Sequence, residues 1–273
     1  MINHIILPTD FSASANKALD YAILLAKKTN SNLTILHVNQ IALLDASMPP
    51  ESYQLFVNEI ENFVEEGFAQ IKSKLSISGI NCNYESKYGF IADEICDFSN
   101  NAQADLIVMG TTGTSGLSEI LIGSNCASVI GRSKIPCLAI PENANVKEFE
   151  KIIYATDYNE PEFPAFSRLL FFAELFDAEV EIVHVESEND HYFNAENNFF
   201  KKNKNTINYS KIKYTNLPKG KTAEVINQYI EQNQADLLVL AKHNRNFFDR
   251  LMHRSLSKKM AYHIHLPLLI LVK

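Results

Sequence analysis

The chain has 273 residues, of which 46% are hydrophobic and 21% charged, a composition typical of a folded globular protein with room for two domains. It carries 25 Lys and Arg against 32 Asp and Glu, which gives a formal net charge of -7 at pH 7. A nucleic-acid binder or an anionic-membrane binder needs a dense cationic surface, so the charge balance argues against both classes.

Short apolar runs alternate with segments of helical period through the first half of the chain. The runs expected to be strands are Ile5–Pro8, Leu33–Val38, Cys82–Glu85, Leu106–Met109 and Cys137–Ile140. The helical segments between them show three apolar stripes, which are Leu19, Ala22, Ile23 and Ala26, then Phe56, Ile60, Phe63, Val64 and Phe68, then Ile91, Ile95 and Phe98. Ser12 or Ser14 is expected to begin the first helix, and Asn30 to end it. All three stripes predict core burial, and we interpret the Phe-rich one as core rather than as a cofactor contact.

The second half of the chain repeats the first. Ile5–Asp10 recurs as Ile152–Asp157, 147 residues later, and Ala104–Met109 recurs as Ala235–Leu240, 131 residues later. The clearest strands of the second copy are Val180–Val185, Leu237–Leu240 and Leu268–Val272. Alternating strands and helices in two copies predict an α/β fold with two doubly wound domains, 1–145 and 146–273, each with a five-stranded parallel sheet. The final strands, Cys137–Ile140 and Leu268–Val272, are candidates for an interface between the copies.

The four cysteines and the N-terminal residues indicate the cellular compartment in which the protein is expected. The cysteines are Cys82, Cys96, Cys126 and Cys137, with no CxxC pair, which favours reduced and mostly buried thiols over a disulfide framework or a zinc knuckle. The N-terminal residues lack the features of a signal peptide, and no apolar run approaches the length of a membrane span. The sequence therefore predicts a cytoplasmic protein without a membrane partner.

A glycine-rich segment follows the predicted strand Leu106–Met109. It runs Gly110-Thr-Thr-Gly113-Thr-Ser-Gly116, and Gly123-Ser124 follows it at the start of a predicted helix. Glycines let the backbone approach an anion closely, and free amides of Gly123, Ser124 and Asn125 at a helix N-terminus would point at phosphate oxygens. Two plainer interpretations stay open, in which the glycines form an ordinary turn and Ser124 is only the helix N-cap.

The spacing Gly110-x2-Gly113-x9-Gly123-Ser124, with Asp10 after the first strand and His37-Val38 at the end of the second, resembles the nucleotide-binding pattern of universal stress proteins. The repeat makes the chain similar to a tandem member of that family. The resemblance implies two Rossmann-like, adenine nucleotide alpha hydrolase-like domains that associate as a pseudo-dimer within one chain, with a homodimer of two chains left open. It also implies a bound adenine nucleotide, ATP or alternatively ADP or AMP, with an accompanying Mg²⁺ left open.

The same resemblance implies a set of ligand-binding residues. Those that would surround adenine and ribose are Pro8, Thr9, Asp10 and Val38. Those that would hold the phosphates, mostly through backbone amides, are Gly110, Thr112, Gly113, Gly123, Ser124, Asn125 and Cys126.

The second copy departs from this pattern at the positions of the glycines. Gly110 becomes Ala241, Gly113 becomes Asn244 and Gly123 becomes Arg254, so we expect the second copy to hold no nucleotide. Its loop carries cations instead, namely Lys242, Arg245, Arg250, Arg254, Lys258 and Lys259. We favour a solvated amphipathic helix face for this segment over an anion site or a single-stranded nucleic-acid contact.

No catalytic constellation or metal-ligand set can be argued from the sequence. His37 and His184 end equivalent strands and are interpreted as structural, and His263 and His265 lack a nearby third metal ligand. The leading hypothesis is a nucleotide-regulated stress-response module. The alternatives are an enzyme for slow ATP hydrolysis or adenylyl transfer, which would depend on Asp10, and a nucleotide-free dimerisation scaffold.

Overall fold

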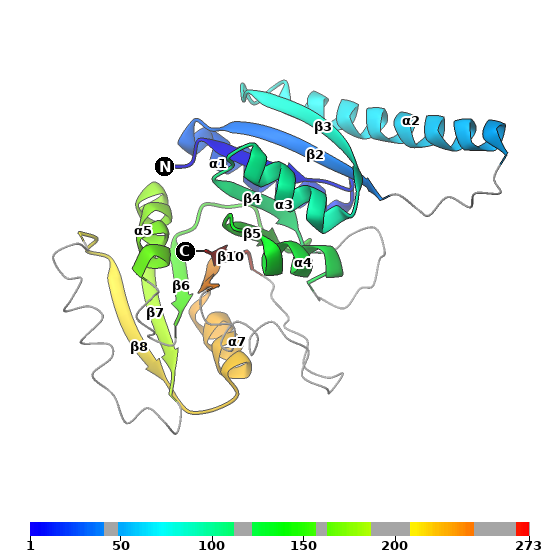
Figure 1. Ribbon diagram of the computed structural model, residues 1–273. Helices are drawn as coiled ribbons and strands as arrows, with labels where there is room; N and C mark the ends of the chain where they lie inside the picture. The colour runs from blue at the N-terminus through cyan, green and yellow to red at the C-terminus, as the bar shows by residue number, and fades with distance from the viewer. Residues whose placement is uncertain (41–48, 112–121, 157–162, 187–207, 243–265, 273) are drawn as a thin grey trace. The chain divides into compact units, whose positions relative to one another are not determined.

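The computed structural model describes residues 1–40, 49–111, 122–156, 163–186, 208–242 and 266–272. The chain divides into two compact units, the first consisting of Met1–Gly116 with Ile122–Ile135 and the second of Pro136–Lys273 with Leu117–Leu121 (Figure 1). The fold is α/β and doubly wound, as predicted. The boundaries at 145 and 146 concern the sequence repeat and stay a prediction.

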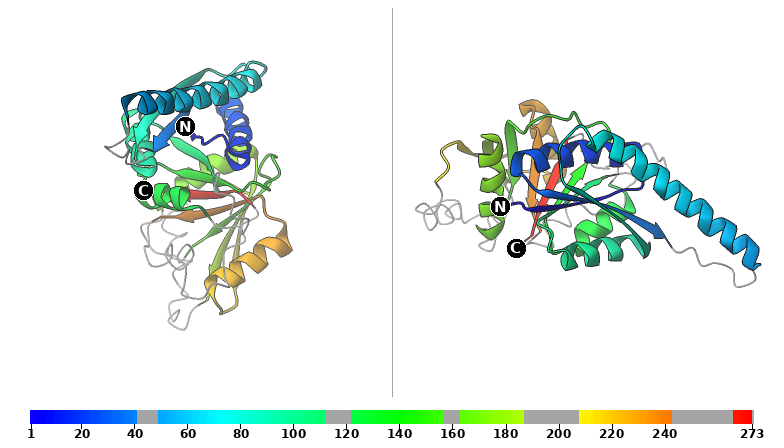
Figure 2. Two further views of the ribbon diagram at one scale, coloured as in Figure 1. Left: turned by 90° about the vertical axis from the view of Figure 1, so that its right-hand side faces the viewer. Right: turned by 90° about the horizontal axis from the view of Figure 1, so that it is seen from above.

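The first unit contains four parallel strands in the order β3-β2-β1-β4. Its strands are β1 (His4–Pro8), β2 (Asn32–Gln40), β3 (Cys82–Gly89) and β4 (Leu106–Gly110), and its helices are α1 (Ala13–Thr29), α2 (Pro50–Leu75), α3 (Ile91–Asn101) and α4 (Ser124–Arg132). Helices α1 and α2 cover one face of this sheet, and α3 and α4 cover the other (Figure 2, right). The chain moves outward from β1 to β3 and then returns to the other side of β1, so β1 and β4 flank a topological switch point.

The second unit contains strand β5 (Cys137–Ile140) and the strands of the second repeat. These are β6 (Lys151–Ala155), β7 (Glu179–Val185), β8 (Ile212–Leu217), β9 (Leu237–Ala241) and β10 (Leu268–Leu271), accompanied by α5 (Phe163–Phe176) and α7 (Thr222–Asn233). The strand order is β5-β10-β9-β6-β7-β8. Every pair in it is parallel except β5 with β10, which are antiparallel, with Leu269 opposite Leu138. The two strands predicted as interface candidates therefore pair with each other.

The ends of α1 follow from two local signals. Ser12 is the N-cap, and its Oγ accepts a hydrogen bond from the Ala15 N–H at 3.2 Å. Asn30 adopts the left-handed conformation at φ 54° and ends the helix. Of the two predicted start residues, Ser12 is correct, whereas Ser14 lies buried inside the first turn.

An equivalent aspartate anchors the first strand in both repeats. Asp105 Oδ2 accepts the backbone N–H groups of Asn3 and His4, at 2.7 and 3.0 Å. Asp236 Oδ2 accepts those of Glu150 and Lys151, both at 2.9 Å. Equivalent aspartates thus fix the first residues of β1 and β6. Their constant offset of 131 residues in the sequence agrees with this shared role.

The predicted burial of the Phe-rich stripe holds for only half of α2. Val64 and Phe68 are buried, but Phe56 and Phe63 are 37% and 52% exposed. The helix runs past the carboxyl ends of β2 and β3 (Figures 1 and 2), so its N-terminal half has no sheet beneath it. The core interpretation was therefore wrong for Phe56 and holds only in part for Phe63, whose half-exposed ring still contacts Phe11 and His37. Periodicity gives the face of a helix but not how far the sheet extends under it.

Candidate functional site

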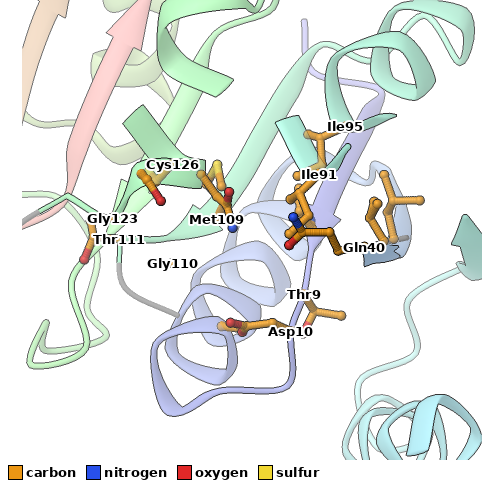
Figure 3. A pocket seen from close by; sticks show the side chains of 16 residues that line it. Thr9, Asp10, Gln40, Ile91, Ile95, Met109, Gly110, Thr111, Gly123 and Cys126 are labelled. Atoms are coloured by element: carbon orange, nitrogen blue, oxygen red, sulfur yellow. The ribbon is translucent and has the colours of Figure 1, made fainter. Parts of the chain in front are cut away.

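A cavity of about 290 Å³ opens at the carboxyl ends of β1, β2 and β4 in the first unit (Figure 3). This edge, at the switch point between β1 and β4, is where open parallel sheets bind ligands. The residues that line the cavity are Pro8, Thr9, Asp10, Ala15, Leu36, Val38, Gln40, Ile91, Ile95, Met109, Gly110, Thr111, Gly123, Ser124, Asn125 and Cys126.

The segment after β1 is held in a tight turn by its own side chains. The Phe11 N–H donates to Thr9 Oγ1 at 3.0 Å, and the Ser12 N–H donates to Asp10 Oδ1 at 3.1 Å. Phe11 has φ 61°, a left-handed conformation that costs free energy for a residue with a side chain. The turn thereby fixes Asp10 at the cavity wall and directs Phe11 toward α2, where its ring leaves no room for a Cβ at Gly67.

His37 supports this turn from β2. Its Nδ1 is 2.8 Å from the Thr9 carbonyl oxygen, and its Nε2 is 3.1 Å from Asn39 Oδ1. The ring also stacks on Phe11, with the centroids 4.9 Å apart. His184 Nδ1 makes the equivalent contact with the Thr156 carbonyl oxygen at 3.0 Å. Both geometries agree with the structural role predicted for these histidines.

Close packing requires Gly110 at the end of β4. A Cβ at this position would lie 2.0 Å from Ser14 Oγ and 2.8 Å from the Ser14 carbonyl carbon. The sequence argument assigned this glycine to the approach of phosphate, but the atoms a side chain would meet belong to α1. Gly110 is therefore needed to let α1 begin directly beside β4.

The other end of the cavity is the first turn of α4. Gly123 is the N-cap and makes no side-chain capping bond, so the interpretation of Ser124 as the cap is wrong. The Gly123 N–H donates to the Thr111 carbonyl oxygen, and therefore the amide of Gly123 is not free as expected. The N–H groups of Ser124, Asn125 and Cys126 have no acceptor within the helix, because the first amides of any α-helix lack one.

Nine of the eleven predicted ligand residues line this one cavity, namely Pro8, Thr9, Asp10, Val38, Gly110, Gly123, Ser124, Asn125 and Cys126. The other two, Thr112 and Gly113, lie outside the described residues. Their roles toward a ligand stay predictions.

Sequence reasoning missed several lining residues. Ile91 and Ile95 were assigned only to the core, although Ile91 opens α3 at the carboxyl edge of the sheet. Gln40, the last residue of β2, was not singled out. Ligands gather at strand ends, so the position of Gln40 just beyond the apolar run could have drawn attention to it.

Comparison with known proteins identifies the family to which the chain belongs. The model of the universal stress protein family matches residues 1–141 and 203–272, which together are more than half of the chain. The chain belongs to the universal stress protein family. The match in two segments agrees with the repeat in the sequence.

Two curated relatives each match about half of this universal stress protein. Universal stress protein YxiE of Bacillus subtilis is 33% identical over 150 residues, covering 51% of this chain and 99% of the relative. Universal stress protein MJ0531 of Methanocaldococcus jannaschii is 32% identical over 137 residues, covering 50% of this chain and 80% of the relative. A solved universal stress protein from Archaeoglobus fulgidus covers 100% of this chain and 99% of its own, with TM-score 0.75 and 18% identity, which supports the tandem fold.

The second repeat of this universal stress protein has Ala241 where the first has Gly110, buried at the end of β9. The other substituted positions, Asn244 and Arg254, lie outside the described residues. The same is true of Asp157, His263, His265 and the cationic residues from Arg245 to Lys259. The predicted absence of nucleotide from this repeat therefore stays a prediction.

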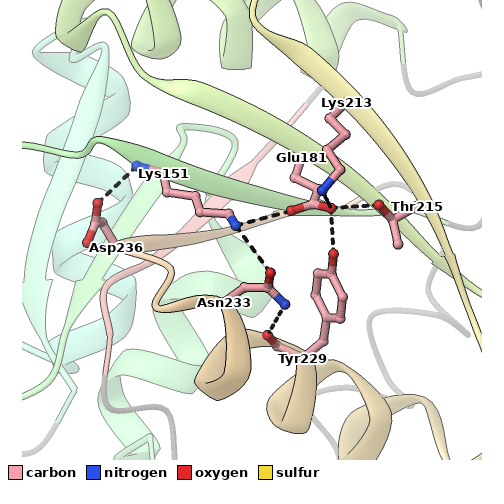
Figure 4. A network of polar contacts seen from close by, with 7 residues as sticks. All are labelled: Lys151, Glu181, Lys213, Thr215, Tyr229, Asn233 and Asp236. Atoms are coloured by element: carbon pink, nitrogen blue, oxygen red, sulfur yellow. Dashed lines mark hydrogen bonds and ion pairs between the residues drawn. The ribbon is translucent and has the colours of Figure 1, made fainter.

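A buried carboxylate forms a polar cluster in the second unit (Figure 4). Glu181 is fully buried on β7, and its Oε1 accepts hydrogen bonds from Thr215 Oγ1 at 2.6 Å, Lys213 Nζ at 3.2 Å and Tyr229 Oη. Its Oε2 lies 3.4 Å from Lys151 Nζ. Burial is the largest single influence and raises the pKa of Glu181, but these donors together outweigh it and lower the pKa to about 2. The carboxylate is thus held ionised as a structural group.

Two features of the part of the chain that the structure describes concern membranes and metals. Among these residues, no helix is long and apolar enough to cross a membrane. Nor does this part of the chain gather three or more His, Cys, Asp or Glu side chains in a way that could hold a metal ion.

Cys126 provides a test of how closed the wall at α4 is. Its side chain is buried, and burial raises the pKa of the thiol to about 12. The thiolate is the nucleophile, so we expect Cys126 to resist iodoacetamide in the native protein at pH 7.5 and to react fully after denaturation. Mass spectrometry of tryptic peptides measures this directly. Rapid native labelling of Cys126 would contradict the closed wall.

Proposed function

We propose that the first unit binds one adenine nucleotide, ATP or its ADP or AMP relatives, and acts as a nucleotide-regulated module in a stress response. The observation that carries the proposal is the chemical asymmetry of the cavity. One end is walled by apolar side chains, the other is the N-terminus of a nine-residue helix, and a carboxylate lies on the wall at Asp10. The base suits the apolar end, the phosphates suit the helix N-terminus, and the ribose between them suits the carboxylate.

The apolar end suits the base. Val38 at the end of β2, Ile91 and Ile95 on α3 and Met109 on β4 supply the walls. A flat aromatic ring placed there gains from burial of apolar surface. Asp10 would accept a hydrogen bond from a ribose hydroxyl next to it.

The polar end suits the phosphates. The N–H groups of Ser124, Asn125 and Cys126 and the positive end of the α4 dipole are suited to negative charge. Gly123 would contribute by shaping the turn, since its N–H already bonds to Thr111. Thr112 and Gly113 remain in the proposal as part of the phosphate loop. An Mg²⁺ ion would reach the site bound to the phosphates, as is usual for this ion.

The proposal assigns the two repeats different tasks within one cytoplasmic chain. The first repeat binds nucleotide, and the second serves as a permanent partner for it. The antiparallel pairing of β5, from the first repeat, with β10, from the second, supports such a pseudo-dimer. Association of two chains would be a further level of assembly.

Replacing Asp10 by Ala tests the site. Loss of a charged hydrogen-bond acceptor should lower ATP affinity by at least about tenfold in isothermal titration calorimetry. Asp157→Ala changes the sequence counterpart in the second repeat and should leave ATP affinity unchanged. Thermal unfolding of both variants checks that they are folded. Equal ATP affinity of Asp10→Ala and the unsubstituted protein would refute the assigned site.

A further inference from the structure

We infer that Gln40 selects the base of the bound nucleotide and favours adenine over guanine. This inference rests on the proposed function and adds a specificity-determining residue to it. Gln40 is the last residue of β2, opposite Gly89 in the register with β3. It lines the cavity, and Figure 3 shows its side chain at the end that also holds Ile91 and Ile95.

The place of the base follows from the two ends of the cavity. Figure 3 shows Thr111 and Gly123 on the side away from Gln40, with Met109 between them and Ile91. Phosphates at the α4 N-terminus would therefore direct the base toward Val38, Ile91 and Ile95. A side chain at the rim of that apolar end meets the edge of the base rather than its face.

Gln40 carries hydrogen-bonding capacity that its neighbours lack. Ile91, Ile95 and Val38 have no polar side-chain atoms. The next residue back, Asn39, already uses its amide: its Oδ1 lies 3.1 Å from His37 Nε2, and its Nδ2 donates to Ser86 Oγ at 3.0 Å. Within the described part of the chain no hydrogen bond is found for the side chain of Gln40, which is exposed to the cavity and solvent. Its amide is thus available to a ligand.

The chemistry of the amide determines which base it prefers. A glutamine presents one acceptor and one donor side by side. Adenine offers the matching pair, with the N6 amino group as donor and N7 as acceptor. On the same edge guanine offers two acceptors, O6 and N7, so the carbonyl of Gln40 would face an acceptor. A carboxylate at this position would instead have two acceptors, which would meet N7 of adenine unfavourably. It would suit the two adjacent donors of guanine, N1–H and the N2 amino group, with guanine turned so that this other edge faces residue 40.

Gln40→Glu tests this directly because the two side chains have nearly the same shape. Affinities for ATP and GTP are measured by isothermal titration calorimetry on the full-length protein at fixed Mg²⁺ and salt. We expect the ratio of ATP to GTP affinity to fall by about tenfold or more, and Gln40→Leu to weaken ATP binding with little gain for GTP. Gln70→Glu, an exposed position on α2, makes the same charge change away from the cavity and should leave the ratio unaltered.

The outcomes separate the inference from the proposed function. If the unsubstituted protein binds ATP and Gln40→Glu binds ATP and GTP in the original ratio, Gln40 does not select the base, while the proposed nucleotide site stands. An equal change of ratio in Gln70→Glu would also overturn the inference, because overall charge would then be the cause. If the unsubstituted protein binds neither nucleotide, both the proposed function and the inference fail.

Discussion

Gly110→Ala should lower the free energy of unfolding by about 2 kcal/mol and weaken ATP binding by at least about tenfold. The added Cβ would lie 2.8 Å from the Ser14 carbonyl carbon and 3.0 Å from the Ala15 amide nitrogen, which are backbone atoms that cannot rotate away. The start of α1 would have to move, and with it the turn that carries Asp10. Urea unfolding and calorimetric titration with ATP measure the two effects.

Gly131→Ala is the matched control for this change. Gly131 lies near the end of α4, in the same unit, and a Cβ there meets nothing within 4 Å. Alanine is the better helix former, so this variant should be as stable as the unsubstituted protein or up to about 1 kcal/mol more stable. A Gly110→Ala protein with unaltered stability and ATP affinity would show that α1 and β4 do not need the close approach.

Glu181→Gln is expected to destabilise the protein by about 3 kcal/mol at pH 7 and to change how stability depends on pH. The folded state lowers the pKa of Glu181 from 4.5 to about 2, so the carboxylate contributes stability above pH 4.5. That contribution is lost as the pH falls from about 4.5 to about 2, because over this range the unfolded chain takes up a proton on Glu181. The folded protein does not, since Lys213, Thr215 and Tyr229 hold its carboxylate ionised. Glutamine has no charge to lose.

Urea unfolding between pH 7 and pH 2.5 tests this expectation. The difference in stability between the unsubstituted protein and Glu181→Gln should be greatest at pH 7 and shrink toward the acid end. Glu179→Gln, two residues earlier on β7 and exposed, removes the same charge outside the cluster and should show a much smaller difference. A Glu181→Gln deficit that is constant over the whole pH range would mean that packing, rather than the charge, is responsible.

The sequence predicted the repeated α/β pattern because buried parallel strands appear as continuous apolar runs. The expected run Cys137–Ile140 is identical to β5, and Leu33–Val38 lies within β2. The periodicity of apolar residues was less informative about how much of a helix is covered by the sheet. It indicated the apolar face of α2 correctly but could not reveal that the N-terminal part of this helix, with the exposed Phe56, extends past the sheet (Figure 1), which depends on where β2 and β3 end.

Some features of the candidate site could likewise be predicted from the sequence, and others could not. Gly123, at the glycine-containing turn, could be named because a glycine before a helix carries a physical signal, whereas Asp10 was named through the resemblance to the universal stress protein family. The packing requirement at Gly110 could not be read from the sequence, because it comes from contact with Ser14, which is 96 residues away along the chain. Glu181 was also missed, since the donors that keep it ionised come from β8 and α7 and meet only in the folded unit.

The nucleotide content of the purified protein tests the central claim most directly. Denaturing a known amount of the full-length protein, and separating the released nucleotide by chromatography with mass spectrometry, gives its identity and its number per chain. A parallel calorimetric titration with ATP counts sites that lost their ligand during purification. We predict one adenine nucleotide per chain in total. No nucleotide together with no binding of added ATP would contradict the proposed function, and two per chain would contradict the assignment of binding to the first repeat alone.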